Sequence, residues 1–416
     1  MCWARVHLEQ ESTKPWCVRI AVLESGERLP LLVRGAFGLP DEKVTEFALV
    51  RLRSRGRAAR TISASVRAVG EALDHLRARG ICLEERIAKG TYLSHEELQA
   101  FATSCKRGRK KRSVHRDHAA NKYSRFLDYV AWLAAPVIAR ASSEAAFAKA
   151  QRDLKRFQVR ASAVAPPSEA AIQSPDSAGG LTPDLRDLLL QVIRPESERN
   201  PWADAALRSR NYAMVMLAYE LGPRAGDVLS LKVRDLSLNR RPATVTFHRR
   251  HDDPEDPRAD QPTLKTKPRV LEISDRLALS IETWLDKFRA DRVRFPDARR
   301  HPFVFVNNRG NPISQRGFQL VYERLREAFP EFGRLVSHSL RHDWNERWVD
   351  LAEKESYDPW GTQRQQCYAM GWSERSNMPA RYARRAIAEA ANRRISRMND
   401  ASENRGNRSQ GSGGAE

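Results

Sequence analysis

The sequence contains few of the residues that build disulfide frameworks and zinc sites. Only five of its 416 residues are cysteines, scattered along the chain without a C-x-x-C pair: Cys2, Cys17, Cys82, Cys105 and Cys367. An odd number of widely spaced cysteines argues against disulfide pairing and against a zinc site, so we expect free thiols in a reducing compartment. The histidines form no H-E-x-x-H motif, and metal catalysis of that type therefore has no support in the sequence.

Long apolar runs are also absent. The longest, from Tyr129 to Ala139, is interrupted by Pro136 and falls far short of the ~20 residues that a membrane-spanning helix needs. The N-terminus shows no basic segment followed by an apolar core, so we expect no secretory signal. A phosphate-binding G-x-x-x-x-G-K-[ST] loop is missing as well, which argues against a nucleotide-driven reaction. These absences favour a soluble intracellular protein.

Positive charge, by contrast, is abundant. Lys and Arg number 72 against 52 Asp and Glu, which gives a formal net charge of +20. Such a surplus favours a polyanionic partner, and nucleic acid is the usual one, with an acidic membrane surface as the competing partner. Hydrophobic residues make up 41% of the chain, enough to build cores, and the length suggests two or three domains at ~150 residues each.

The N-terminal part of the chain divides into a β-like stretch and a helical one. Residues 1–40 hold two short β-like segments around a turn at Glu24–Glu27, and we expect a hairpin or arm there. Residues 41–160 show apolar positions spaced three and four apart, with Thr61 and Ser94 as expected N-caps and a capping-box pattern at Ser94. This stretch predicts a compact helical domain.

The composition of the rest of the chain predicts a linker, a mixed domain and a tail. Residues 161–181 are rich in Ala, Ser, Pro and Gly without apolar periodicity, so we expect a linker. Residues 182–397 mix helical and β-like patterns, and Thr182-Pro183 provides an N-cap and a first helical residue. The β-like runs predict strands at 243–248, 269–273 and 303–306. Residues 398–416 are polar and rich in Gly and Ser, so we expect them to be disordered.

Two arginine fragments in residues 182–397 could carry chemistry. Arg224 follows Gly-Pro, and Asp227, one helical turn later, could orient its guanidinium; a surface ion pair at a helix start is the alternative. His338 and Arg341 are three residues apart, which on a helix puts a proton-transfer group beside a guanidinium. The alternative for this second fragment is a solvated helix face.

Two further fragments carry lysine and tyrosine. Lys265 and Lys267 lie between two predicted strands, where they could reach into a groove or belong to a solvated turn. Tyr382 is flanked by basic residues and follows Met370-Gly-Trp372 by ten residues. It could be a nucleophile, a phosphate contact or a packing residue.

The order of these residues is more informative than any of them alone. The sequence resembles the tyrosine recombinase family, also called phage-type integrases, in the order of these residues: Arg, then a hairpin Lys, then His-x-x-Arg, then Trp or His, and then Tyr. Other segments resemble the family as well: Arg210–Gly222, Phe303–Gly310, Pro312–Ser314 and Leu340–His342. Residues 182–397 resemble the family's catalytic domain well, and residues 41–160 loosely resemble the core-binding domain that usually precedes it.

The resemblance implies a role for each matching position. Arg224 and Arg341 would clamp the non-bridging oxygens of the scissile phosphate, and Tyr382 would be the nucleophile. Lys265 would be the general acid that protonates the leaving 5′ oxygen, with Lys267 as the competing candidate. Two fixed guanidinium groups can stabilise the transition-state charge without a metal, and basic surroundings favour the ionised tyrosine.

The resemblance also assigns supporting positions and shows departures. His338 would act in proton transfer or hydrogen-bond the phosphate, and Trp372 would stand where many members have a second histidine. Asp227 and His342 would support these residues. The spacing from Arg341 to Trp372 is longer than is usual in the family, with an insertion at 353–366.

A run of basic residues precedes the helical pattern that starts near Arg116. A solvated loop and a nuclear-import signal are the alternatives for such a run. Within a core-binding domain, it would contact DNA phosphates with strong salt dependence and little sequence reading. The residues concerned are Lys106, Arg107, Arg109, Lys110, Lys111 and Arg112.

The fold class implied by the resemblance is mainly α with a small β-sheet (α+β), a helical SAM-like core-binding domain ahead of a tyrosine-recombinase catalytic domain. The implied function is site-specific recombination of double-stranded DNA, as in integration or excision of a mobile element, without a metal, ATP or another cofactor. The implied assembly is a homotetramer on two DNA sites, with accessory proteins. The implied location is the cytoplasm, in association with the nucleoid and away from membranes. The alternatives are a catalytically silent DNA-binding regulator and a type IB-like topoisomerase.

Overall fold

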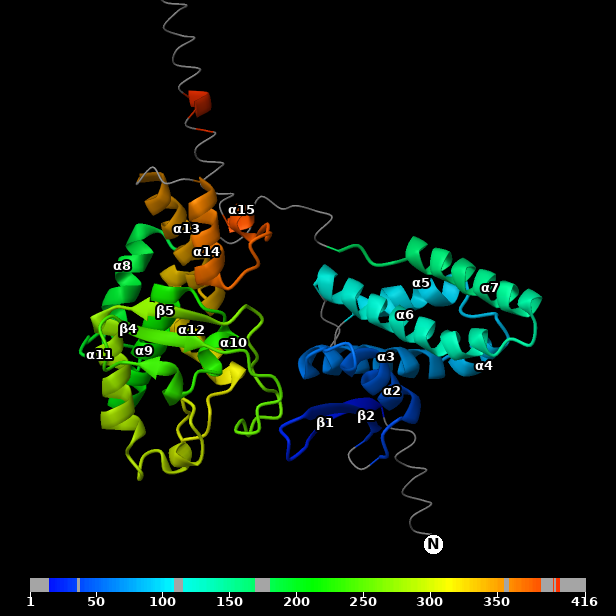
Figure 1. Cartoon of the computed structure of the whole chain (residues 1–416), viewed down its shortest axis with the longest axis horizontal. Helices are drawn as coiled ribbons and strands as arrows, with labels where there is room; N and C mark the ends of the chain where they lie inside the picture. The colour runs from blue at the N-terminus through cyan, green and yellow to red at the C-terminus, as the bar shows by residue number, and fades with distance from the viewer. Residues whose placement is uncertain are drawn as a thin grey trace, which may run out of the picture. The chain divides into compact units, whose positions relative to one another are not determined.

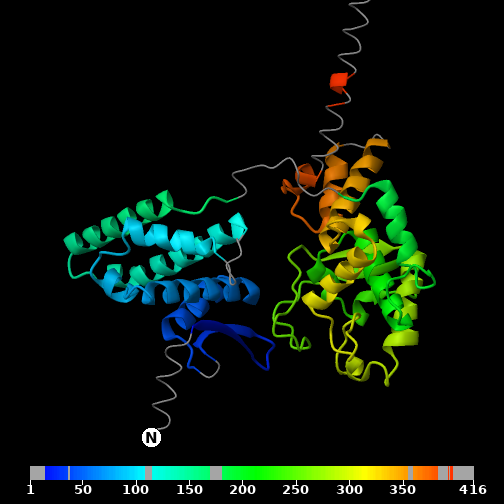
Figure 2. The ribbon, with the colours of Figure 1, turned by 180° about the vertical axis from the view of Figure 1, so that it is seen from behind.

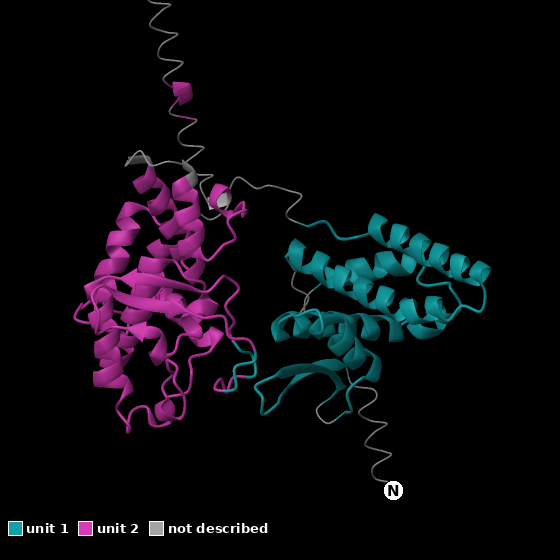
Figure 3. Ribbon diagram, in the orientation of Figure 1, with its two compact units in different colours: residues 1–175, 252–254, 259–261 teal, residues 176–251, 255–258, 262–416 magenta. Residues whose placement is uncertain are grey.

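The chain forms two compact units (Figure 3). The computed structural model describes residues 15–35, 38–107, 115–168, 180–354, 359–382, 392 and 394–396. Unit 1 comprises residues 1–175, 252–254 and 259–261, and unit 2 comprises residues 176–251, 255–258 and 262–416. Most of the expected linker, the centre of the basic run and the tail from residue 397 onward lie outside the described residues.

Unit 1 consists of a β-hairpin and a set of helices (Figure 1). Its elements are β1 (Trp16–Val22), β2 (Arg28–Arg34), α2 (Glu42–Glu46), a π-helical stretch (Phe47–Arg53), α3 (Ala59–Arg77), α4 (Leu83–Ala88), α5 (His95–Cys105), α6 (Arg116–Ala139) and α7 (Glu144–Ala163). The expected hairpin is confirmed, with Ile20 opposite Pro30 in an antiparallel pair. It packs against α3 rather than standing apart, because Leu32 is buried in the helical core.

Local signals explain where the helices of unit 1 begin. The capping box at Ser94 is confirmed, since its hydroxyl accepts from the backbone N–H of Glu97 and the Glu97 carboxylate accepts from the Ser94 N–H. The N-cap expected at Thr61 is wrong, because α3 begins two residues earlier, at Ala59. The core is aromatic: the Phe101 and Phe126 rings meet edge to face at 4.8 Å.

Unit 2 surrounds a helix that is buried on nearly every side. That helix, α9 (Ala205–Leu221), contacts α11 (Asp275–Thr283) and α13 (Ser337–Lys354). The other elements are α8 (Pro183–Val192), α10 (Ala225–Leu229), a 3₁₀ turn (Val233–Asp235), β3 (Leu236–Ser237), β4 (Ala243–Phe247), β5 (Arg269–Ile273), a π-helical stretch (Trp284–Arg289), two further 3₁₀ turns (Pro296–Arg300 and Pro330–Phe332), α12 (Gln315–Ala328), α14 (Pro359–Met370) and α15 (Met378–Tyr382). A helix without a polar face must be covered on every side by the side chains of other elements, and α9 therefore lies at the centre of the unit.

The sheet of unit 2 is small and antiparallel, in the order β3-β4-β5. Two of the expected strands are confirmed as β4 and β5, with Val245 opposite Leu271. The strand expected at 303–306 is wrong: this segment is buried, but its ends make only isolated bridges, to Lys232 and to Pro312. Helices α13 and α14, orange in Figure 1, lie side by side there and in the reverse view of Figure 2.

The architecture is mainly α with small β-sheets, as the α+β class predicts. Thr182 caps α8 as expected, accepting from the backbone N–H of Leu185 at 3.4 Å. Across the described ranges, every helix is too short or too polar to span a lipid bilayer.

The main hydrophobic cores of the two units are separate from one another, which leads to a first prediction. Phe126→Ala removes a fully buried ring from unit 1, and we expect it to destabilise that unit by about 3–5 kcal/mol. Hydrogen exchange should accelerate in the helices of unit 1 and stay unchanged in α9 and α12. The matched control, Phe318→Ala, empties a position in the core of unit 2 and should give the reverse pattern. Equal acceleration in both units by either variant would contradict separate cores.

Candidate active site

Arg224 is positioned by the end of the buried helix α9. Gly222 ends this helix with a left-handed φ of +56°, and a Cβ at that position would lie 3.0 Å from the side chain of Trp344. The chain then turns into α10, where Arg224 is the N-cap residue and donates its backbone N–H to Asp227 Oδ2 at 3.2 Å. The short helix therefore sets the direction in which Arg224 leaves the backbone.

Asp227 pairs with a different arginine from the one expected. Its Oδ2 lies 3.1 Å from Nη2 of Arg269, and both side chains are fully buried. An ion pair between Asp227 and the guanidinium of Arg224 is absent within the described part of unit 2, where Nη1 of Arg224 is buried without a hydrogen-bond partner. The expectation that Asp227 orients this guanidinium is therefore wrong, because β5 brings Arg269 to the carboxylate.

The segment with the two candidate lysines is held at both ends. Leu264 and Thr266 are buried, whereas Lys265 and Lys267 are exposed. The backbone N–H of Lys267 donates to the carbonyl oxygen of Gly371 at 2.8 Å. At the other end the chain runs close to α10, since a Cβ on Gly226 would lie 2.6 Å from the Thr263 oxygen. Both lysines therefore extend from a fixed backbone, and each remains a candidate.

Arg269 is a residue of the site that the sequence did not single out. Besides the pair with Asp227, it donates from Nε to the carbonyl oxygen of Ala369 at 2.7 Å and from Nη1 to Thr266 Oγ1 at 3.0 Å. Burial lowers its pKa, while Asp227 raises it and Arg224 lowers it. The only signal in the sequence was an arginine at the start of a β-like run, Arg269–Ile273.

Arg341 joins the end of α9 to the end of α14. Its side chain is fully buried; Nη1 donates to the Gly222 oxygen at 2.6 Å and Nη2 to the Met370 oxygen at 3.3 Å. Its Cζ lies 5.3 Å from the ring centroid of Trp372, a cation–π arrangement. The carbonyl oxygen of Arg341 accepts from Asn345 Nδ2 at 2.7 Å. The structure thus brings Arg341 together with Trp372 and with the turn that leads to Arg224.

The two histidines of the motif lie on α13 next to Arg341. The rings of His338 and His342 meet edge to face, with centroids 4.6 Å apart. His338 is exposed and precedes Arg341 by one turn, which fits the helical spacing expected for the pair. His342 is half-buried.

Tyr382 is the last residue of α15, and its side chain lies outside the described residues. Helix α15 contacts both α13 and α14. No group of three or more His, Cys, Asp or Glu suited to a metal ion occurs in the described ranges.

The basic run belongs to unit 1, and only its start is described. Lys106 and Arg107 are exposed at the end of α5, and residues 109–112 lie outside the described part of the chain.

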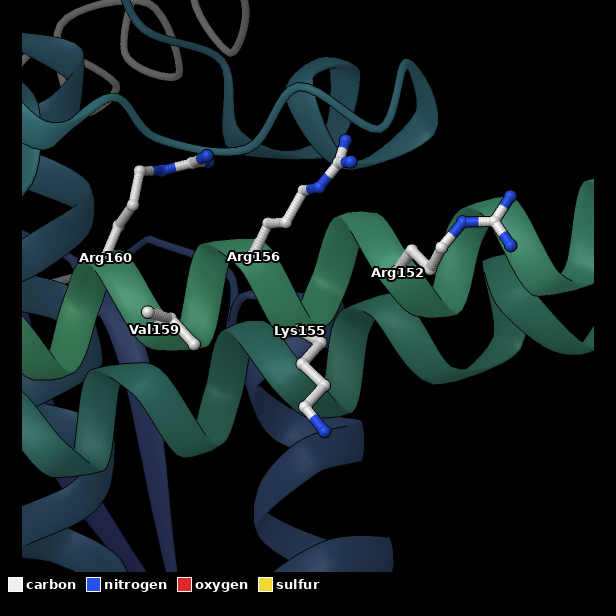
Figure 4. Close-up of a pocket in the computed structure, with 5 residues that line it drawn as sticks. All are labelled: Arg152, Lys155, Arg156, Val159 and Arg160. Carbon is white, nitrogen blue, oxygen red and sulfur yellow. The ribbon is translucent and has the colours of Figure 1, made fainter.

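A second basic feature of unit 1 was missed. Figure 4 shows Arg152, Arg156 and Arg160 on one side of α7 and Lys155 on the opposite side. They line a surface hollow of about 440 Å³ together with Val159. The spacing of four between the arginines was the available signal.

Comparisons with known proteins agree with the motif. A model described as the phage integrase family matches residues 194–386. Tyrosine recombinase XerC of Roseiflexus sp. (strain RS-1) is 27% identical over 169 residues, which cover 41% of this chain and 46% of the relative. Tyrosine recombinase XerD of Halalkalibacterium halodurans is 26% identical over 135 residues, which cover 32% of this chain and 39% of the relative. The chain therefore matches less than half the length of these curated relatives.

Solved structures show a looser likeness. The Tn1549 transposon integrase in complex with transposon right end DNA gives a TM-score of 0.48 at 14% identity, over 83% of this chain and 99% of that chain. XerA recombinase gives a TM-score of 0.35 at 13% identity, over 85% of this chain and 98% of that one.

The matched range includes every motif residue from Arg224 to Tyr382. Residues 194–386 therefore match the phage integrase family model, and the curated proteins similar to this chain are tyrosine recombinases, as the resemblance of the motif predicts.

Proposed function

We propose that the chain is a site-specific DNA recombinase that cuts and rejoins strands through a 3′-phosphotyrosyl intermediate. The observation that carries this proposal is the buried guanidinium of Arg341, which joins Gly222, next to the Arg224 turn, to Met370, next to Trp372. Residues far apart in the sequence are thereby gathered within the family domain. Integration or excision of a mobile element is the use we propose for this activity.

The proposed cleavage step balances without an external energy source. The Tyr382 oxygen forms a bond to phosphorus as the bond to the 5′ oxygen breaks. Lys265 gives a proton to that 5′ oxygen, and His338 takes or shares the tyrosine proton. One phosphodiester replaces another, so the reverse step can rejoin a strand without ATP.

Arg224 and Arg341 would stabilise the negative charge that develops on the equatorial oxygens of the phosphate. Guanidinium groups suit this task because they are planar, remain charged and donate in a fixed fork. Nη1 of Arg224 is buried without a hydrogen-bond partner among the described residues, so one donor of this guanidinium is unsatisfied. Two donors of Arg341 are already engaged by carbonyl oxygens, which holds its plane still.

The proposed partner is double-stranded DNA, bound by a homotetramer on two sites, with accessory proteins where the element requires them. The basic run at 106–112 and the arginine row of α7 are the proposed phosphate contacts of unit 1. Arg152 and Lys155 are exposed and make no ion pair among the described residues, whereas Arg156 lies 3.9 Å from Asp153. We place the protein with the nucleoid in the cytoplasm, where its substrate would be.

The nucleophile assignment predicts a specific covalent adduct. DNA bound by the protein is first selected from a randomised duplex library, and a nicked version then traps the cleaved strand. We expect the wild-type chain to form an adduct that survives denaturation, and Tyr382→Phe to bind the same DNA without forming one. Tyr368→Phe is the matched control, since this tyrosine is exposed and donates to the carbonyl oxygen of Val270.

Other outcomes of the adduct experiment would overturn the proposal in distinct ways. An adduct that persists in Tyr382→Phe would remove the tyrosine from its role. Tight binding without any wild-type adduct would favour the silent regulator. Relaxation of plasmids that lack a bound site would favour the topoisomerase.

The general acid assignment predicts different effects for two neighbouring lysines. Lys265→Ala should slow cleavage about 10²–10⁴-fold, because the leaving oxygen loses its proton donor, whereas Lys267→Ala should change the rate by less than about tenfold. A substrate with sulfur at the 5′ bridging position should restore cleavage by Lys265→Ala, since a thiolate leaves without a proton. The opposite pattern would assign the role to Lys267.

The exposed basic residues that line the hollow on α7 predict a change in salt dependence. Replacing Arg152, Lys155 and Arg156 by Gln should weaken DNA binding and reduce the slope of log K against log salt by about 0.9 for each DNA phosphate that the variant no longer neutralises. The control removes the same charge from exposed positions of unit 2: Arg292, Arg299 and Arg300. If both triple variants show the same slope, the effect is one of net charge and α7 is not a contact surface.

A further inference from the structure

Arg269 is a fully buried cation for which the proposed mechanism has no use. Its guanidinium donates to a carboxylate, a hydroxyl and a backbone carbonyl, at 3.1, 3.0 and 2.7 Å. Its Cζ also lies 4.5 Å from the ring centroid of Phe247, the residue opposite it in the β4–β5 pair. A guanidinium held on so many sides has one orientation.

Each partner of Arg269 belongs to a different segment of the candidate site. Asp227 accepts the backbone N–H of Arg224 with the same oxygen that receives Arg269. Thr266 stands between the two candidate lysines. Ala369 directly precedes Met370, whose carbonyl oxygen supports Arg341. One side chain therefore contacts the segments that hold the first arginine, the lysines and the support of the second arginine.

The backbone on the far side of Arg269 is shaped to allow this approach. Gly371 has a φ of +65°, and a Cβ there would lie 2.9 Å from Nη1 of Arg269 and 2.7 Å from Cβ of Thr266. The carbonyl oxygen of the same glycine accepts the backbone N–H of Lys267. The connection from α14 to α15 thus closes directly over the guanidinium and over the lysine segment.

We propose that Arg269 is a positioning residue for strand cleavage. It sets the lysine segment against the N-terminus of α10 and the end of α14, so that the proton donor and the first clamp arginine meet the same phosphate. The catalytic part of this inference rests on the proposed function. The structural part, that one guanidinium holds these segments together, can be tested without DNA.

The first test measures amide hydrogen exchange in the full chain. Arg269→Lys keeps the charge opposite Asp227 but cannot reach the threonine hydroxyl and the alanine carbonyl together. We expect faster exchange at the Lys267 amide, which donates to Gly371, and at the Arg224 amide, which donates to Asp227. Exchange in α9 should stay slow.

A second variant covers the case in which loss of the cation disturbs folding. Arg269→Met combined with Asp227→Asn leaves no buried charge unpaired and keeps an oxygen to accept the Arg224 amide. It should show the same local acceleration in the lysine segment. Unchanged exchange at Lys267 in both variants would overturn the inference.

The second test compares cleavage of a normal nicked substrate with one that carries sulfur at the 5′ bridging position. Displacing a proton donor by about 1 Å can cost on the order of 10²-fold, and we expect both Arg269 variants to slow cleavage of the normal substrate on that scale with DNA affinity within about threefold of wild type. The sulfur substrate should recover most of the loss, because its leaving group needs no proton.

The matched control is Arg210→Met, at another buried arginine of unit 2. Arg210 donates to the Asn211 side chain and to the Val306 carbonyl, so its loss is structural. It should affect both substrates alike.

The outcomes separate the inference from the proposed function. Equal slowing of both substrates by the Arg269 variants would make Arg269 structural only and would overturn the positioning role. If the wild-type chain forms no adduct on DNA that it binds, the proposed function fails, and hydrogen exchange alone then decides whether Arg269 holds the segments together.

Discussion

Burying Arg269 against Asp227 takes two charges out of water, and the fold of the site follows from satisfying them. Desolvation of such a pair can cost as much as the attraction returns, so the pair is weak evidence for stability. What it supplies is geometry, because each remaining donor of the guanidinium needs a partner at hydrogen-bond distance. Those partners come from the lysine segment and from α14, and the sheet is thereby tied to the helices that carry the motif.

Helix α13 also carries buried charges of both signs, and each of them needs hydrogen-bond partners. Arg341 directs two donors to the carbonyl oxygens at the ends of α9 and α14. Two residues later, the buried carboxylate of Asp343 accepts from Arg186 at 2.6 Å and from Arg347 at 2.9 Å, and also from the backbone N–H of Leu181 at 3.3 Å. Rotation of α13 would break both sets of bonds, so the helix that presents His338 is held from two sides.

Periodicity and caps predicted most of the elements because their causes are local. Ser94 and Thr182 each satisfy backbone N–H groups within one turn, and β4 and β5 follow from β-branched runs bounded by turn residues. The segment 303–306 has the same apolar composition, yet its neighbours offer only isolated bridges. The apolar composition of a segment therefore predicts that it is buried, whereas strand pairing depends on which backbone segment lies beside it.

The order of the motif residues identified the family domain, but the partner of Asp227 could not be inferred from spacing. Helical geometry places Arg224 one turn away, whereas the actual partner, Arg269, is 42 positions later. Only the tertiary arrangement of β5 against α10 creates this contact. The partner in a long-range charge pair of this kind cannot be predicted from a single sequence.

The same contacts change what the net charge of +20 means for binding. Arg210 and Arg269 are buried and bonded within unit 2, so they add to the formal charge without offering a surface to a polyanion. The exposed arginines on α7 are of the other kind, with side chains directed to solvent and little internal compensation. Salt screens exposed charges far more than buried ones. Raising the ionic strength should therefore weaken the interactions of the exposed arginines on α7 and leave those of the buried arginines unchanged. The proposed affinity for DNA and the proposed geometry of cleavage therefore rest on different arginines and can be varied separately.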